Sequence, residues 1–147
     1  MTIAWKFAGV AALFAVAAAT LSRVIWPDIP GMDAPSAIQL PFFILLSVIE
    51  AAAFGLGMAF LIFGFGRAMR VAGWPGKLAF LSTVWLLISW WPHDNLHRVM
   101  HEGDFWGLLR IEYGFHVTLM IAAGLVAYYL WTLHRPSPPQ NMPLPGF

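Results

Sequence analysis

The sequence predicts an all-α integral membrane protein, a bundle of four transmembrane helices with a short extra helix between spans three and four. Three observations predict this class. Hydrophobic residues make up 60% of the 147 residues, and charged residues only 10%, whereas about a quarter of a soluble domain is charged. The mean hydropathy is +0.72. Four apolar stretches approach the ~20 residues that a helix needs to cross ~30 Å of hydrocarbon.

The first two predicted spans cover residues 3–25 and 37–66. Lys6 and Arg23 lie near the ends of the first span, where long cationic side chains can reach the two membrane interfaces. Small residues of the second span predict that a neighbouring helix approaches it closely, because they leave room for another backbone. These residues are Ala53, Gly57, Gly64 and Gly66.

The third and fourth predicted spans cover residues 75–91 and 105–133. The third ends in Trp90 and Trp91, a pair typical of a membrane interface. Asp104 is placed to cap the fourth span through its side chain. A short helix is expected between these two spans.

The four spans form one predicted domain, residues 1–135, followed by a proline-rich tail, residues 136–147. The loop between spans two and three carries three basic residues and no acid: Arg67, Arg70 and Lys77. Basic loops stay in the cytoplasm, so both termini are predicted there, with the histidine segment described next on the outer side. We expect the inner membrane of a bacterium.

The segment that follows the third span carries three histidines at four-residue steps. Pro92 is expected to begin a short helix here and Gly103 to end it. Four-residue steps place imidazoles on one helix face, as metal sites on helices require. Acids and a further histidine complete the predicted ligand set: His93, His97, His101, His116, Glu112 and Asp94. The chain has no cysteine, so nitrogen and oxygen ligands for iron, zinc or copper are expected instead of a thiolate site.

Ionisable side chains within predicted spans are functional candidates, because each costs at least ~2.5–3.5 kcal/mol to insert into hydrocarbon. Glu50 and Glu112 are the predicted catalytic acids. Glu112 and His116 are four residues apart and share one helix face. A polar stripe on the second span is predicted to face the bundle interior: Gln39, Phe43, Ser47 and Glu50.

Each of these groups also has a purely structural interpretation. The histidines of the segment can face water at the interface, and Glu112 can pair with a neighbouring histidine or arginine. Glu50 can be protonated and bonded to a serine or to the backbone. Ser82 and Ser89 share a face of the third span, where each hydroxyl can bond back to its own helix.

The His93-x-x-x-His97 step near a membrane surface, with Glu112 and His116 on a later span, resembles the histidine boxes of membrane di-iron hydroxylases and desaturases. The resemblance implies an iron centre acting on a lipophilic substrate. Those families use more histidines, in several boxes on the cytosolic side. An aromatic-rich bundle holding His and Glu is also similar to the emopamil-binding family of sterol isomerases, which implies acid–base isomerisation.

Three functions follow from these residues. The first is a membrane metalloprotein with a His/Glu metal site in the outer half of the bundle, which would act as an oxidoreductase on a lipophilic molecule. The second is a b-type haem protein, with His116 and a segment histidine as axial ligands, or an accessory subunit of an electron-transfer complex. The third is a metal-free acid–base lipid isomerase that uses Glu50, Glu112 and His116.

The expected partners follow from the apolar composition and from the charge. They are the lipid bilayer, a lipophilic small molecule, and further copies of the chain or a larger membrane complex. The net charge of +1 and the scattered basic residues exclude nucleic acid as a partner, because phosphate backbones are bound by clustered positive charge.

Overall fold

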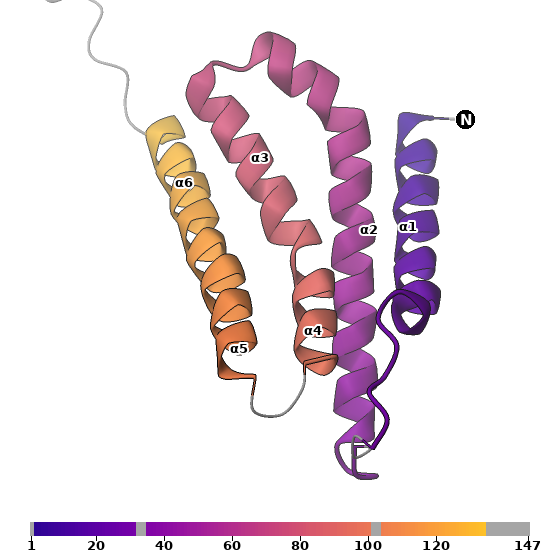
Figure 1. Cartoon of the computed structure of the whole chain (residues 1–147). Coiled ribbons are helices and arrows are strands. Elements are labelled where there is room, and N and C mark those ends of the chain that lie inside the picture. Colours follow the sequence, from indigo (N-terminus) through magenta and orange to yellow (C-terminus); the bar gives the residue numbers. More distant parts are fainter. Residues whose placement is uncertain (1, 32–34, 101–103, 135–147) are drawn as a thin grey trace, which may run out of the picture.

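The computed structural model describes residues 2–31, 35–100 and 104–134, and every regular element in these ranges is helical (Figure 1). The predicted tail at 136–147 lies outside the described residues. The helices in chain order are α1 (Ile3–Ile25), α2 (Leu40–Val71), α3 (Trp74–Ile88), α4 (Trp90–Arg98), α5 (Phe105–Ile111), the π-helical segment η1 (Glu112–Val117) and α6 (Thr118–Leu133).

Three helices of the described chain are long and apolar enough to span a membrane. They are α1, α2 and the continuous rod formed by α5, η1 and α6, Phe105–Leu133. The bounds predicted for the first and fourth spans are those observed. The protein is therefore all-helical with apolar helices suited to a bilayer.

The third predicted span is divided, so four full spans are not confirmed. α3 has 15 residues, about 22 Å at 1.5 Å per residue, which is less than the ~30 Å of hydrocarbon. Pro92 explains the break. In a continuous helix its ring would clash with the carbonyl of Ile88, and Ile88 is the last residue of α3. The short helix therefore begins at Trp90, not at Pro92, and ends at Arg98.

The long helices lie side by side in the order α1, α2, α3, α6, with α4 beyond the end of α3 (Figure 1). The main contacts join α1 with α2, α2 with α3, and α3 with α6, while α4 contacts α2, α3 and α5. Within the described residues the helices form an open row, and the predicted bundle of four spans is not confirmed. Along the helix axes, the start of α1, the α2–α3 connection and the end of α6 lie at the same end (Figure 1). The helix α4 and the start of α5 lie toward the opposite end.

Glycines of α2 allow its close contacts with both neighbours. A Cβ on Gly55 would clash with the Ala11 backbone oxygen of α1, and one on Gly57 would clash with Ile88 of α3. Gly64 lies equally close to Phe80 of α3. Gly57 and Gly64 thus lie at close approaches, whereas Gly66, also predicted to do so, meets only the end of an arginine side chain.

The predicted polar stripe of α2 is wrong except at its last residue. Gln39, Phe43 and Ser47 are exposed and Glu50 is buried. The first turns of α2 extend past the ends of α1 and α4 (Figure 1), so no neighbouring helix covers them. α2 also continues beyond the predicted end at residue 66 to Val71, because single arginines do not stop a helix at a membrane surface.

Candidate histidine–carboxylate site

One side of α4 is hydrogen-bonded to the end of α1 and to the segment that follows it. Asn95 is buried; its Oδ1 accepts a hydrogen bond from the Ser22 hydroxyl at 2.8 Å, and its Nδ2 donates to the Trp91 carbonyl at 2.7 Å. The Arg98 guanidinium donates to the Asp28 carboxylate. These contacts fix the rotation of α4 about its axis, and so they direct its two histidines toward the α5–η1 rod.

The two histidines of α4 form a hydrogen-bonded pair. Nε2 of His93 lies 3.1 Å from Nε2 of His97, and the rings meet edge to face with centroids 4.6 Å apart. The His93 ring also contacts His116 at 4.9 Å and Phe115 at 5.2 Å. Three imidazoles from two helices therefore meet at one place.

Glu112 joins the histidines of the two helices. Its Oε1 lies 3.4 Å from Nε2 of His97, and its Oε2 lies 2.5 Å from Nδ1 of His116. Each oxygen of one carboxylate thus faces a different imidazole. The Glu112 and His116 side chains are 39% and 45% exposed, so the site is open to a molecule that approaches from outside the helix row.

Glu112 and His116 both lie on the π-helical segment. Such segments are rare and occur often at functional sites. The Thr118 hydroxyl, which follows the segment, lies 2.7 Å from the Gly114 carbonyl oxygen and 3.0 Å from that of Phe115. The Trp85 indole donates to the same hydroxyl at 3.0 Å. Side chains thus satisfy carbonyl groups where the regular helical bonding pattern changes.

The surroundings of His93 keep this imidazole neutral. Burial lowers its pKa below the usual 6.5, and the positive charges of His97 and His116 lower it further, whereas Glu112 and Asp94 oppose the shift. A neutral imidazole retains one nitrogen lone pair. His93 is therefore suited to accept a hydrogen bond or a proton inside the cluster.

Asp94 does not join the histidines and instead meets Glu50 of α2. The two carboxyl groups are close enough to interact electrostatically, and Glu50 is only 6% exposed. This arrangement differs from the predicted contact of Glu50 with a serine or the backbone.

The predicted metal-ligand set is brought together only in part. His93, His97, His116 and Glu112 meet, Asp94 turns to α2, and His101 lies outside the described residues. Among residues 2–31, 35–100 and 104–134, no group of three or more His, Asp or Glu side chains could hold a metal ion. The donor atoms contact one another instead of leaving a position for an ion.

The arginine pairings considered for Glu112 also differ from those observed. Arg98 pairs with Asp28, which also lies 3.0 Å from Arg23. The cause is the end of α1, which brings Asp28 to α4 on the side away from Glu112. The carboxylate of Glu112 is consequently left to the histidines.

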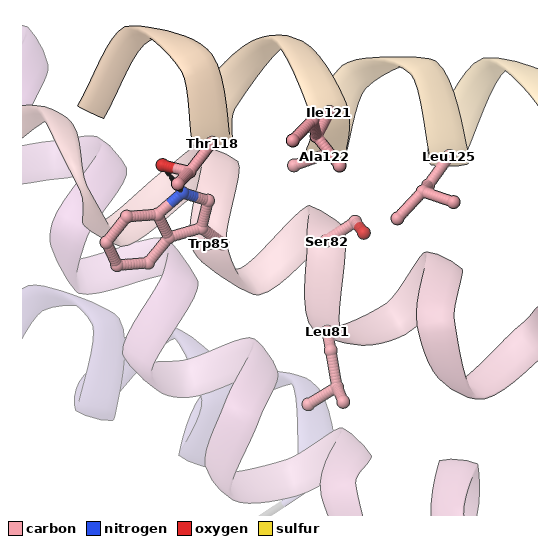
Figure 2. A pocket seen from close by; sticks show the side chains of 7 residues that line it. All are labelled: Leu81, Ser82, Trp85, Thr118, Ile121, Ala122 and Leu125. Carbon is pink, nitrogen blue, oxygen red and sulfur yellow. Dashed lines mark hydrogen bonds between the residues drawn. The ribbon is translucent and has the colours of Figure 1, made fainter. Parts of the chain in front are cut away.

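Sequence reasoning missed a pocket between α3 and α6 with a volume of about 240 Å³ (Figure 2). Its polar lining residues are Ser82, Trp85 and Thr118. Ser82 and Ser89 had the alternative of bonding back to their own helix. In the described part of the chain neither hydroxyl does so: the Ser89 Oγ is buried without a partner, and the Ser82 hydroxyl also lacks one. In the sequence, the signal that could have indicated this pocket was a serine, Ser82, within an apolar predicted span.

No family model matches the chain, and no curated protein or solved structure is significantly similar to it. What the site does must therefore follow from its own geometry and chemistry.

Proposed function

We propose that the histidine–carboxylate site transfers protons to and from a lipophilic substrate, as a metal-free acid–base isomerase does. The supporting observation is the continuous chain of polar contacts from His93 through His97 and Glu112 to His116. Side chains placed at such distances exchange protons, and general acid–base catalysis typically contributes 10²–10⁴-fold to a rate. Proton transfer along these side chains does not require a metal ion.

The environments of the histidines divide the roles between them. His93, kept neutral by burial, supplies the lone pair, and the hydrogen between the two Nε2 atoms then belongs to His97. Glu112 stabilises a positive charge on either histidine that faces it. His116 and Glu112 are the more exposed members, so these two would touch the substrate, while His97 and His93 hold Glu112 in position.

We propose that Glu50 and Asp94 share a further proton, because burial disfavours two negative charges side by side. Asp94 is the neighbour of His93 in sequence and acts on it electrostatically. Loss of the shared proton would place a second negative charge beside Glu50, which burial disfavours. The pair would thus keep the negative charge beside His93 constant during turnover. Glu50 would act through Asp94 and not on the substrate.

The chemistry supported by this arrangement is the shift of a carbon–carbon double bond. One carbon of the substrate receives a proton from His116 and another loses a proton to the Glu112 carboxylate, so the product is an isomer. Proton transfer from Glu112 to His116 through their direct contact returns both to their initial states. No oxidant, reductant or co-reactant enters this balance.

Deuterium labelling tests this proposal without knowledge of the substrate. Membranes from cells that overproduce the chain are incubated in D₂O, and the extracted lipids are analysed by mass spectrometry. The Glu112 and His116 side chains are exposed, so the proton that they hold between turnovers exchanges with D₂O. His116 then delivers a deuteron to carbon, and one lipid class should gain deuterium. Glu112→Gln should reduce this gain by about 100-fold, in the usual range for loss of an acid–base group.

The control is Tyr113→Phe, since Tyr113 is exposed on the same π-helical segment and should leave the gain unchanged. If no lipid class gains more deuterium with the wild type than with Glu112→Gln, the proposal is wrong.

A metal centre is the second candidate, although no group of three or more His, Asp or Glu side chains among the described residues could hold an ion as arranged. Two donor separations support it. The 3.1 Å and 3.4 Å separations at His97 are close to the ~3.3 Å between two ligands placed ~2.0–2.1 Å from a tetrahedral ion. Iron, zinc or copper would displace the shared hydrogen. Elemental analysis of untagged protein decides this: about one equivalent that His97→Ala removes would support a metal enzyme, and less than about a tenth of an equivalent would exclude it.

The haem alternative has less support. The imidazole rings of His93 and His116 are in direct contact with each other, which leaves no gap for a porphyrin between them. Haem binding would require α4 to separate from η1.

We further propose that the site lies toward the outer surface and the termini in the cytoplasm. Arg67, Arg70 and Lys77 flank the α2–α3 connection, and the site lies toward the opposite end of the row (Figure 1). The positive-inside rule supports this orientation. In it, α3 is immersed between α2 and α6 as a shortened third crossing, continued to the outer surface by α4.

A further inference from the structure

The pocket between α3 and α6 has an apolar body. Four side chains supply it: Leu81 from α3 and Ile121, Ala122 and Leu125 from α6. Both helices carry exposed apolar residues beside it, Leu81 and Ile121 among them. Its volume of about 240 Å³ lies below the ~300–1,000 Å³ of sites that enclose a drug-sized molecule. It therefore suits one hydrocarbon chain or one ring.

A hydroxyl without a partner faces this apolar space. Ser82 is 7% exposed, it lines the pocket, and no group in the described part of the chain forms a hydrogen bond with it. Figure 2 shows its oxygen between the two helices, beside the α6 side chains. The other two polar groups of the pocket are satisfied, since Trp85 donates to Thr118. A hydroxyl that opens onto an apolar space has no hydrogen-bond partner there, and a ligand oxygen would supply one.

We propose that the pocket binds a bilayer-resident lipophilic molecule that carries a carbonyl oxygen, which accepts a hydrogen bond from Ser82. The occupant comes from the membrane because α3 and the α5–η1–α6 rod border the pocket with exposed apolar side chains. A carbonyl is favoured because the serine hydroxyl is a donor that no acceptor in the described chain uses. The hydrocarbon part would contact Leu81, Ile121 and Leu125.

The pocket adjoins the histidine–carboxylate site through two aromatic rings. Trp85 lines the pocket and stacks on Phe115 with centroids 5.9 Å apart, and Phe115 contacts His93 at 5.2 Å. A molecule anchored at Ser82 would extend past this pair toward Glu112. That the molecule is the isomerase substrate rests on the proposed function, whereas binding in the pocket does not.

Photolabelling tests the pocket directly. The protein in phosphatidylcholine nanodiscs is labelled with two diazirine probes of equal length, a long-chain methyl ketone and the corresponding alkane, and the labelled residues are mapped by mass spectrometry. We expect the ketone to label α3 and α6 residues of the pocket, and Ser82→Ala to reduce this labelling at least fivefold. Labelling by the alkane should be weaker and independent of Ser82.

A second pair of variants keeps the test valid if one variant is unstable. Ala122→Phe fills the pocket and should abolish ketone labelling, whereas Ala123→Phe adds the same ring at an exposed position and should not. Equal labelling by both probes, unaffected by Ser82→Ala, would overturn the proposal and leave a surface that contacts ordinary lipid only.

The two proposals fail separately. Ketone labelling that persists in Glu112→Gln, without deuterium gain by the wild type, would retain the pocket and reject the isomerase. Deuterium gain without specific labelling would do the reverse.

Discussion

Nδ1 of His116 lies 2.5 Å from Oε2 of Glu112, and both residues belong to a π-helical segment inside a long apolar rod. The spacing of four residues predicts that they share a face. The π-helical segment also places this pair beside α4. There the other carboxylate oxygen of Glu112, Oε1, lies close to His97. A local change in helix type thus joins an intrahelical contact to an interhelical one.

Thr118→Val should disturb this segment. The substitution removes the hydroxyl that bonds the Gly114 and Phe115 carbonyls and accepts from Trp85. We expect a loss of about 1–2 kcal/mol in unfolding free energy and altered ¹⁵N chemical shifts of His116. Thr132→Val is the control, because Thr132 also bonds a carbonyl of its own helix, that of Tyr129, but lies far from the site. Equal effects of the two variants would show that Thr118 has no special role.

The stability of the protein should fall as the pH is lowered below about 6.5. Burial and neighbouring positive charge hold the pKa of His93 below 6.5 in the folded state, so the unfolded chain binds the proton more readily there. Stability is then full above pH 6.5 and is lost as the pH falls toward the folded pKa. The titratable groups that act on His93 are His97, His116, Glu112 and Asp94.

Thermal unfolding in detergent between pH 7.5 and 5.5 measures this dependence. His93→Phe keeps an aromatic ring in the cluster and should flatten the decrease of the unfolding temperature. His134→Gln, at the end of α6, should keep the decrease. An unchanged pH dependence in His93→Phe would assign the effect to other groups.

Asn95→Ala should detach α4 from α1. The amide of Asn95 is buried and bonds Ser22, Arg98 and the Trp91 carbonyl, and its removal leaves those groups unsatisfied. We expect a loss of about 1–3 kcal/mol and a weaker contact between His97 and Glu112, visible in imidazole NMR signals. Thr20→Ala removes only an exposed bond within α1 and should be nearly neutral. A stable Asn95→Ala protein with unchanged histidine signals would contradict the role of this contact.

Gly55→Leu should separate α1 from α2. Any side chain at this position meets the backbone of Ala11 and the side chain of Ala15, and overpacking typically costs about 1–3 kcal/mol. Gly124→Leu is the matched control, since a Cβ there has no neighbour within 4 Å. Crosslinking between cysteines introduced at Phe7 and Phe63, whose ring centroids lie 6.0 Å apart, should decrease in the first variant and not in the second.

The sequence by itself determined the elements that depend on local physics. Apolar length placed the first and fourth predicted spans at their observed bounds, and Asp104 caps the last span by accepting from the Gly107 amide at 2.8 Å. The small residues of α2 pointed to two of its close approaches. These features depend on the length of apolar segments, on the size of single residues and on neighbours within a few positions, all of which can be read from a sequence.

Tertiary structure decided which predicted site residues meet. Histidine spacing shows that His93 and His97 share a face, but only the fastening of Asn95 to α1 sets the direction of that face. The same rotation of α4 places Asp94 near Glu50 and places His97 near Glu112. Helix rotation and helix order depend on contacts between segments far apart in sequence, and no local pattern encodes them. The pocket at Ser82 arises for the same reason, because its lining residues come from α3 and from α6, which meet only when packed together.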